Sequence, residues 1–220
     1  MESYLALACD YDGALASEGQ VDAAILAALR RFRETGRRLI LVTGRRLEGL
    51  LPVFPHINLF ERAVLENGAL LYRPAKGEER LLGAPPSEVF VRTLKARGVN
   101  PLSVGRVITA TWEPHVRIVH ETIRELGLEL EVILNKRAVM VLPPGINKAS
   151  GLRIALDELG LPPEKVVGVG DAENDRDLLD LCGYGVAVAN ALPMLKDCAD
   201  FVTVGERGAG VCELIDKLMS

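Results

Sequence analysis

The sequence lacks the marks of several protein classes. None of its four cysteines forms a CxxC pair, and its three histidines lack the spacing of a metal site. The sequence therefore indicates neither a zinc site nor a disulfide framework, and it favours buried thiols in a reducing compartment. A formal net charge of −4 leaves no broad basic surface, so binding to nucleic acid without sequence preference is disfavoured.

The N-terminus lacks a targeting signal. In MESYLALACDYDG, Glu2 comes first, and only residues 4–9 are free of charged or strongly polar groups before Asp10. The segment has no basic region, and its apolar run is too short for a signal peptide or a membrane span. We therefore expect a cytoplasmic protein that does not bind membranes.

Apolar runs alternate with helical patterns in the first sixty residues and in the last third of the chain. Residues 4–9 and 39–42 are short apolar runs typical of buried parallel strands, and Asp22 can cap a helix between them. The last third predicts helices alternating with strands: helices at 149–159, 175–181, 193–198 and 211–219, and strands at 166–169, 184–189 and 201–204. This alternation predicts an α/β fold with a doubly wound, mainly parallel sheet.

The middle of the chain departs from this alternation. Residues 63–73 predict a hairpin that turns at Asn67-Gly68. The stretch between Pro85-Pro86 and Pro143-Pro144-Gly145 predicts a small α+β unit: helices at 87–97 and 114–126, and strands at 104–111, 128–134 and 138–142. We therefore expect a split core and an inserted cap: residues 1–83 and 145–220 for the core, and residues 84–144 for the cap.

Four polar sites lie at the ends of predicted strands and helices of the core. They are Asp10-Tyr11-Asp12-Gly13, Thr43-Gly44-Arg45, Lys148 and the run 170–175. Three of them come directly after predicted buried strands, and Lys148 opens the helix that leads to the last. Ligands of open α/β sheets bind beyond the carboxyl ends of the strands. The predicted topology therefore gathers acidic groups, a hydroxyl and an ammonium at one edge.

These residue types suit phosphoryl transfer. Carboxylates without histidine or cysteine suit a hard cation such as Mg²⁺, which binds through one or two carboxylates together with the phosphate. Thr43 and Lys148 can hold phosphate oxygens, helped by the backbone N–H of Gly44. Asp10 can attack in line to form an aspartyl-phosphate, and Asp12 can act as general acid and base.

The same four sites resemble a known set of motifs. DYDGAL, LVTGR, the INKASGL lysine and GDAENDRDLL are similar, in order and spacing, to the four motifs of the haloacid dehalogenase superfamily, over essentially the whole chain. A cap between the second and third motifs and the GDxxND form of the fourth resemble its Cof-type group. That group includes phosphatases of sugar phosphates and of phosphoglycolate, and phosphomannomutases.

The resemblance implies a role for each motif residue. Asp10 is the nucleophile and Asp12 the acid and base, while the phosphate is bound by Thr43, Gly44 and Lys148. Mg²⁺ is held by Asp10, the Asp12 carbonyl and Asp171, with Asp175 and Asn174 supporting these ligands from behind. The implied protein is a Mg²⁺-dependent phosphatase, a monomer or homodimer, that hydrolyses a small metabolite such as a sugar phosphate or phosphoglycolate.

Several further residues are candidates. Residues that can line the substrate pocket are Arg45, Glu66, Asn67, Trp112 and Glu113, with Arg117, Asn135 and Lys136 as further cap candidates. One position departs from the family pattern, since Ala14 stands where members usually carry Thr or Val. The loss of that hydroxyl is expected to perturb hydrogen bonding around the nucleophile loop and can reduce activity.

Three alternatives stay open at the level of the sequence. A phosphomutase uses the same residues but returns the phosphoryl group to a sugar. A phospho-accepting signalling module also combines acidic residues, threonine, lysine and Mg²⁺ on a doubly wound sheet, although its acceptor lies at a mid-chain strand. Ala14 also motivates a catalytically weak binding protein.

Overall fold

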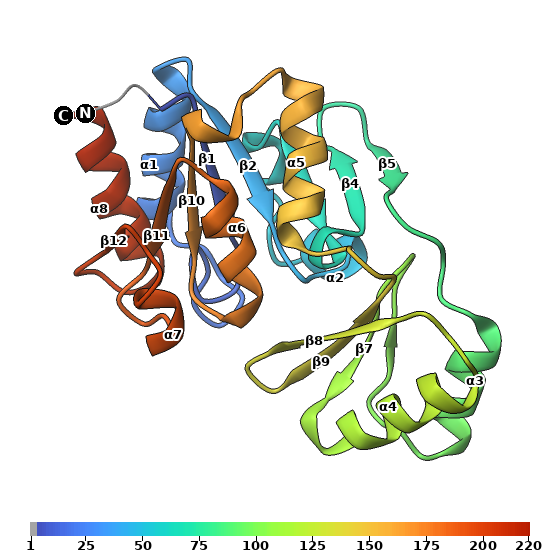
Figure 1. Ribbon diagram of the computed structural model, residues 1–220. Helices are drawn as coiled ribbons and strands as arrows, with labels where there is room; N and C mark the ends of the chain where they lie inside the picture. The colour runs from blue at the N-terminus through green and yellow to red at the C-terminus, as the bar shows by residue number, and fades with distance from the viewer. Residues whose placement is uncertain (1–3) are drawn as a thin grey trace.

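An eight-stranded sheet, built from the first and last parts of the chain, dominates the computed structural model, which describes residues 4–220 (Figure 1). Glu2 and the start of the segment expected to lack a targeting signal lie outside the described residues. The sheet runs in the order β12-β11-β10-β1-β2-β3-β4-β5. Its strands are β1 Ala6–Asp10, β2 Arg38–Val42, β3 Arg62–Leu65, β4 Leu70–Arg73, β5 Glu78–Leu81, β10 Val166–Gly170, β11 Tyr184–Ala187 and β12 Phe201–Val202.

The six strands from β12 to β3 are parallel, and β4 and β5 complete one side as antiparallel strands. The central strand β1 is buried along its whole length, as its apolar sequence predicts for a parallel strand covered on both faces. Its register pairs Asp10 with Val42 and Cys9 with Val169. The carboxyl ends of β1, β2 and β10 therefore lie level with one another.

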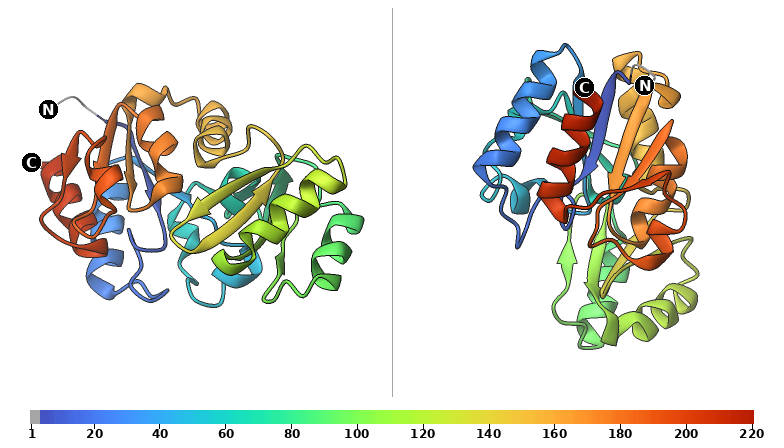
Figure 2. Two further views of the ribbon diagram at one scale, coloured as in Figure 1. Left: turned by 60° about the horizontal axis from the view of Figure 1, so that its bottom comes forward. Right: turned by 90° about the vertical axis from the view of Figure 1, so that its left-hand side faces the viewer.

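Helices cover both faces of this sheet. In Figures 1 and 2, α1 and α8 lie together on one face, and α5 and α6 lie on the other. Local signals set their ends: the Asp22 carboxylate accepts the Ile25 N–H at the start of α1, and Gly160 ends α5 in a left-handed conformation. The helices are α1 Ala23–Glu34, α2 Leu47–Leu50, α5 Lys148–Leu159, α6 Arg176–Leu181, α7 Pro193–Lys196 and α8 Arg207–Met219.

A second, antiparallel sheet of order β6-β7-β9-β8 lies beyond the carboxyl ends of the parallel strands, with two helices on its outer face (Figure 1). Its small core is formed by buried side chains that include Phe90, Leu94 and Val119. We call this part the cap. Its elements are α3 Glu88–Ala96, β6 Ser103–Val104, β7 Thr109–Trp112, α4 Val116–Glu125, β8 Glu131–Asn135 and β9 Ala138–Leu142.

The predicted fold class is confirmed: a doubly wound, mainly parallel sheet carries a smaller α+β unit. Two local predictions differ from the structure. The single strand predicted at 104–111 is wrong, because a turn at Gly105 divides it into β6 and β7. The exposed strand β5, rich in charged residues, has no apolar pattern and was not predicted.

The four cysteines are free in the described residues. Cys9 and Cys182 are buried, and Cys198 and Cys212 are half-buried against the same core. Burial raises the pKa of the Cys9 thiol well above its ordinary value, so this thiol is inert. Within residues 4–220, no helix has both the length and the apolar character needed to cross a membrane.

Glu158, near the end of α5, connects this helix to strands β3, β4 and β5 of the large sheet. Its carboxylate accepts hydrogen bonds from Arg62 on β3, Arg73 on β4 and Arg80 on β5, at 2.6 to 3.1 Å. These bonds, with that of Arg73 the strongest, lower the pKa of Glu158 to about 2. The carboxylate therefore stays ionised in the folded protein at pH values where it is protonated in the unfolded chain.

Replacing Glu158 by Gln is expected to lower the free energy of unfolding at neutral pH by about 1 kcal/mol, because the charge network is lost. Since the folded pKa lies below the ordinary 4.5, the wild-type advantage is complete above about pH 4.5 and declines as the pH falls towards about 2. Urea unfolding at about pH 7, 4 and 3 measures this difference, with Glu34→Gln, at an exposed position at the end of α1, as the control. If the difference in unfolding free energy between wild type and Glu158→Gln did not change with pH, the lowered pKa of Glu158 would be wrong.

Candidate active site

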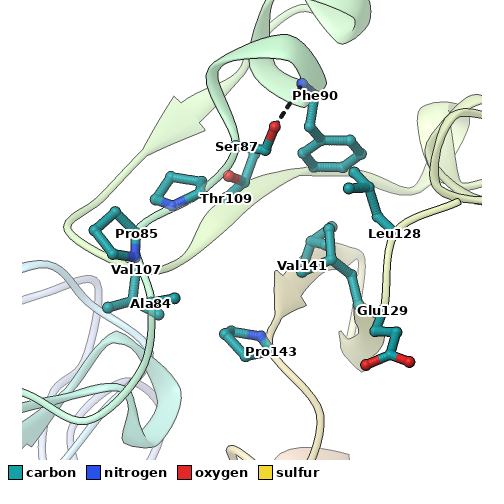
Figure 3. Close-up of a pocket in the computed structure, with 12 residues that line it drawn as sticks. Ala84, Pro85, Ser87, Phe90, Val107, Thr109, Leu128, Glu129, Val141 and Pro143 are labelled. Carbon is teal, nitrogen blue, oxygen red and sulfur yellow. Dashed lines mark hydrogen bonds between the residues drawn. The ribbon is translucent and has the colours of Figure 1, made fainter. Parts of the chain in front are cut away.

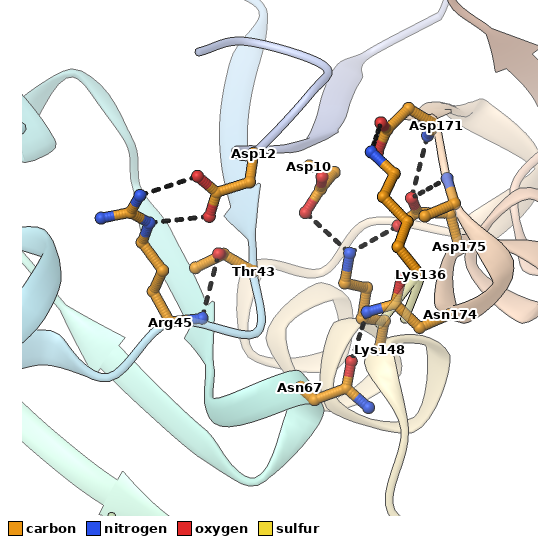
Figure 4. A network of polar contacts seen from close by, with 11 residues as sticks. Asp10, Asp12, Thr43, Arg45, Asn67, Lys136, Lys148, Asp171, Asn174 and Asp175 are labelled. Atoms are coloured by element: carbon orange, nitrogen blue, oxygen red, sulfur yellow. Dashed lines mark hydrogen bonds and ion pairs between the residues drawn. The ribbon is translucent and has the colours of Figure 1, made fainter. Parts of the chain in front are cut away.

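The four motifs of the sequence meet at the edge where the parallel strands of the core end and the cap begins. Asp10 is the last residue of β1, Thr43 follows β2, and Asp171 follows β10. Lys148 is the first residue of α5, and the Asn147 side chain caps this helix by accepting the Ser150 N–H at 2.8 Å. The level register of the strands therefore brings these four side chains into one site (Figure 4).

Lys148 joins two carboxylates in the interior. Its Nζ donates to Oδ1 of Asp10 at 2.7 Å and to Oδ1 of Asp175 at 2.6 Å, and all three side chains are at most 5% exposed. Burial alone would lower the pKa of Lys148, but the two carboxylates outweigh it and raise that pKa above its ordinary value. Lys148 is therefore a permanent cation at this site, as its predicted part in phosphate binding requires.

Asp175 is held in place by the backbone that precedes it. Its Oδ2 accepts the N–H groups of Asp171 at 2.9 Å and of Ala172 at 3.1 Å, while its Oδ1 faces Lys148. Residue 170 has to be glycine, since a Cβ there would lie 2.4 Å from the Asp175 Cβ. The turn after β10 therefore orients two carboxylates toward the end of β1.

Three carboxylates, of Asp10, Asp171 and Asp175, offer oxygens that lie within 4.8 Å of one another. All three residues are buried, and burial raises the pKa of Asp10 well above its ordinary value and raises that of Asp171. A charged carboxylate in such a place needs a cation beside it. An oxygen-only donor set of this kind fits a hard divalent cation such as Mg²⁺.

Gly13 leaves the room that this cluster needs. Its φ of +88° lies in the left-handed region, and a Cβ there would lie 2.1 Å from Oδ2 of Asp171. Asn190 anchors the same turn by donating to the Gly13 carbonyl at 2.9 Å. Ala14 is fully buried, and the loop keeps its shape through backbone bonds such as that from the Ala16 N–H to the Tyr11 carbonyl, at 2.7 Å.

Asp12 faces away from this cluster, toward Arg45 (Figure 4). The guanidinium donates to both carboxylate oxygens of Asp12, at 2.7 and 2.8 Å, and lies over the Tyr11 ring at 5.2 Å. The Asp12 side chain is 46% exposed. Thr43 is buried, and its hydroxyl oxygen accepts the Arg45 N–H at 3.1 Å. Arg45, predicted to bind the substrate, is therefore paired with Asp12, the predicted general acid and base.

A cavity of about 450 Å³ opens between this edge and the cap. From the core it is lined by Asp10, Asp12, Thr43, Gly44 and Arg45. From the cap it is lined by Ile108, Ala110, Trp112, Asn135, Lys136, Ala138 and Met140. The predicted pocket residue Trp112 and the cap candidates Asn135 and Lys136 therefore face the carboxylates across one cavity.

A second cavity, of about 170 Å³, lies within the cap and contains none of the motif residues (Figure 3). Its lining is mostly apolar and includes Phe90, Leu128 and Val141. Glu129 is the one charged residue of this lining and has neither a carboxylate cluster nor a cation beside it there, so we place the active site at the sheet edge.

Other predicted pocket residues lie elsewhere. Asn67 is buried and accepts a hydrogen bond from the Asn174 amide at 2.8 Å, so both side chains are engaged beside the carboxylate cluster. Glu113 is exposed, points toward Arg137 at 3.6 Å and does not line the cavity. Arg117 is exposed on α4 and pairs with Glu121.

Glu66 has a different position from the one predicted. Its carboxylate is fully buried and accepts three backbone N–H groups of the cap, from Arg106, Val107 and Ile108, at 2.9 to 3.0 Å. A Cβ on Gly105 would lie 2.5 Å from this carboxylate, so the turn between β6 and β7 needs glycine there. Glu66 thus anchors the cap to the core, a role with no local signal in the sequence.

Lys136 makes a contact that was not predicted. It lies at the tip of the β8–β9 hairpin, and its Nζ donates to Oδ2 of Asp171 at 2.6 Å (Figure 4). The sequence marks it only as a basic residue in a cap turn. The contact depends on how the cap is placed over the core, which no local pattern encodes.

Comparison with known proteins gives a consistent picture. The model of the haloacid dehalogenase-like hydrolase family matches residues 7–87 and 116–215. A phosphoglycolate phosphatase of Methanothermobacter thermautotrophicus is 33% identical over 97% of this chain and 98% of its own. A phosphoglycolate phosphatase of Haloarcula marismortui is 30% identical over 95% of this chain and 95% of its own.

Solved structures share the fold. A haloacid dehalogenase-like hydrolase from Bacteroides thetaiotaomicron superimposes with a TM-score of 0.83 at 21% identity, covering 98% of this chain and 99% of that one. A sugar phosphatase of subclass IIB of the superfamily gives a TM-score of 0.80 at 19% identity, covering 97% and 98%. Both likenesses include the sheet and the cap.

Replacing Gly13 by Ala is expected to weaken binding of a divalent cation by about 10- to 100-fold, because the new methyl group displaces the Asp171 carboxylate. Gly77→Ala is the matched control, since Gly77 also has a positive φ but a Cβ there meets nothing within 4 Å. Calorimetric titration with Mg²⁺ compares the two folded variants. Equal affinities in Gly13→Ala and Gly77→Ala would show that the cation does not bind beside Asp171.

Proposed function

Because this chain belongs to the haloacid dehalogenase-like hydrolases and is a phosphoric monoester hydrolase, we propose that it is a Mg²⁺-dependent phosphatase acting on phosphoglycolate. The observation that carries this proposal is the buried cluster in which Lys148 joins Asp10 to Asp175 beside Asp171. It combines a nucleophile, a fixed positive charge and a cation site, and Asp10 brings the cluster to the wall of the cavity under the cap.

Asp10 is the nucleophile of the proposed reaction. One of its carboxylate oxygens attacks phosphorus, and the bond from phosphorus to the leaving oxygen breaks, which forms an aspartyl-phosphate. Water then attacks the same phosphorus, and the bond to Asp10 breaks to release phosphate. Lys148 orients the carboxylate through its 2.7 Å hydrogen bond and faces the charge that develops on the phosphoryl oxygens.

Asp12 moves the protons. It donates a proton to the leaving oxygen in the first step and takes one from the attacking water in the second. In this structure it is paired with Arg45, so it has to exchange that partner for the leaving oxygen. Thr43 and Gly44 lie on the cavity wall beside Asp10, where a hydroxyl and an N–H group can bind phosphoryl oxygens.

The proposed Mg²⁺ would be held by Asp10, Asp171 and the Asp12 carbonyl, with Asp175 and Asn174 supporting them. When bound, the ion neutralises phosphoryl oxygens and draws electron density from phosphorus. The three clustered carboxylates and the space left by Gly13 fit such an ion.

The size of the cavity and the relatives together favour a small substrate. About 450 Å³ suits a compact phosphomonoester. The relatives that align over nearly the whole chain are phosphoglycolate phosphatases. In this proposal residues 84–144 act as a lid on the core of residues 1–83 and 145–220, excluding water during attack.

Release of phosphate from 2-phosphoglycolate is the direct test. We expect hydrolysis that requires Mg²⁺, and we expect Asp10→Asn to lower kcat by at least about 10³-fold because the nucleophile is lost. Asp157→Asn, on the exposed side of α5, is the matched control and keeps the rate. If Asp10→Asn kept the wild-type rate, the assignment of Asp10 as the nucleophile would be wrong.

The same assay tests the choice of substrate. Glucose 6-phosphate serves as the comparison, since sugar phosphates are the other substrate class that the motifs suggest. A higher kcat/KM for phosphoglycolate is expected, because the relatives that align over nearly the whole chain are phosphoglycolate phosphatases. A higher kcat/KM for glucose 6-phosphate would contradict the proposed substrate and would indicate a sugar phosphatase.

A further inference from the structure

Lys136 is held against the core by two contacts. Its backbone N–H donates to the Glu173 carboxylate at 2.8 Å, and its Nζ donates to Oδ2 of Asp171 at 2.6 Å. The residue adopts a φ of +54° in the turn that joins β8 to β9. Its side chain is 48% exposed, whereas that of Asp171 is 1% exposed. A cap lysine thus reaches a buried carboxylate at the proposed cation site (Figure 4).

The ammonium of Lys136 stands in for a cation at Asp171. Among residues 4–220, no other side chain donates a hydrogen bond to this carboxylate, whereas Asp10 and Asp175 share Lys148. A divalent cation on Asp171 would therefore compete with Lys136 for this carboxylate. Lys136 would then have to find a new anionic partner.

The walls of the cavity show where that partner has to come from. Arg45, the other cation of the lining, is engaged by both oxygens of Asp12. Lys148 is 1% exposed, does not line the cavity and is engaged by two buried carboxylates. Lys136 is thus the one cation of the lining whose own partner a metal would displace. The other lining residues of the cap are one amide, Asn135, and five uncharged side chains: Ile108, Ala110, Trp112, Ala138 and Met140. A substrate in this cavity can therefore supply the missing anion through its leaving group.

We propose that Lys136 exchanges partners, from Asp171 in the metal-free protein to the carboxylate of the substrate's leaving group once a divalent cation occupies Asp171. Lys136 is then the residue that selects phosphomonoesters with a short acidic leaving group. This inference rests on the proposed phosphatase function and names the residue that sets its substrate class. It also makes the cap lysine and the cation competitors for one carboxylate.

The test uses two variants of the same hairpin, Lys136→Met and Arg137→Met. Arg137 is the next residue, is 76% exposed and points to Glu113 on the cap, so its replacement removes the same charge without touching the cavity. The substrates are 2-phosphoglycolate and ethyl phosphate, which has the same two-carbon chain without the carboxylate.

For Lys136→Met, the ratio of kcat/KM for phosphoglycolate to that for ethyl phosphate is expected to fall by about 10- to 100-fold, the loss of one charge-assisted hydrogen bond. For Arg137→Met, the ratio is expected to stay within about twofold of wild type, as for an exposed charge. An unchanged ratio in Lys136→Met, or an equal fall in both variants, overturns the specificity role.

Calorimetric titration with Mg²⁺ alone tests the exchange of partners without turnover. Lys136→Met is expected to bind Mg²⁺ at least about threefold more tightly than Arg137→Met, because the competing ammonium is gone from Asp171. Equal or weaker binding overturns the exchange. If wild type hydrolyses neither ester, the proposed function fails. If it hydrolyses phosphoglycolate and Lys136→Met keeps the ratio, only this inference fails.

Discussion

The ammonium of Lys148, buried between the carboxylates of Asp10 and Asp175, is the contact on which the site depends. Three buried carboxylates within 4.8 Å of one another repel each other and lose the solvation of water. A single cation hydrogen-bonded to two of them offsets much of that cost. This contact depends on two features of the fold. The parallel register of β1 and β10 places the carboxylates side by side, and α5 begins at Lys148 beside them.

The cap meets the core through two carboxylates with different functions. Glu66 is fully buried and binds three backbone N–H groups, so it fixes the joint at which the cap turns away from the sheet. Asp171 binds the half-exposed Lys136 at the hairpin tip. One contact is therefore buried at the joint and the other lies at the cavity, where the proposed exchange of partners would take place.

Much of this architecture could be predicted from local patterns. Apolar runs located the parallel strands, and the polar residues after them located the edge where Asp10, Thr43 and Asp171 meet. What could not be predicted depends on contacts between distant segments. The strand expected at 104–111 is divided because Glu66, about forty residues earlier, binds the backbone of its turn. The reach of Lys136 to Asp171 likewise follows from the placement of the cap.

In the proposed reaction the Asp10 carboxylate, held by Lys148, accepts the phosphoryl group. Quenching the reaction with phosphoglycolate and reducing it with borohydride converts an aspartyl-phosphate to homoserine, which peptide mass spectrometry locates. Homoserine is expected at position 10, formed only when Mg²⁺ and substrate are both present. Homoserine at position 12, or at any other aspartate, would contradict it.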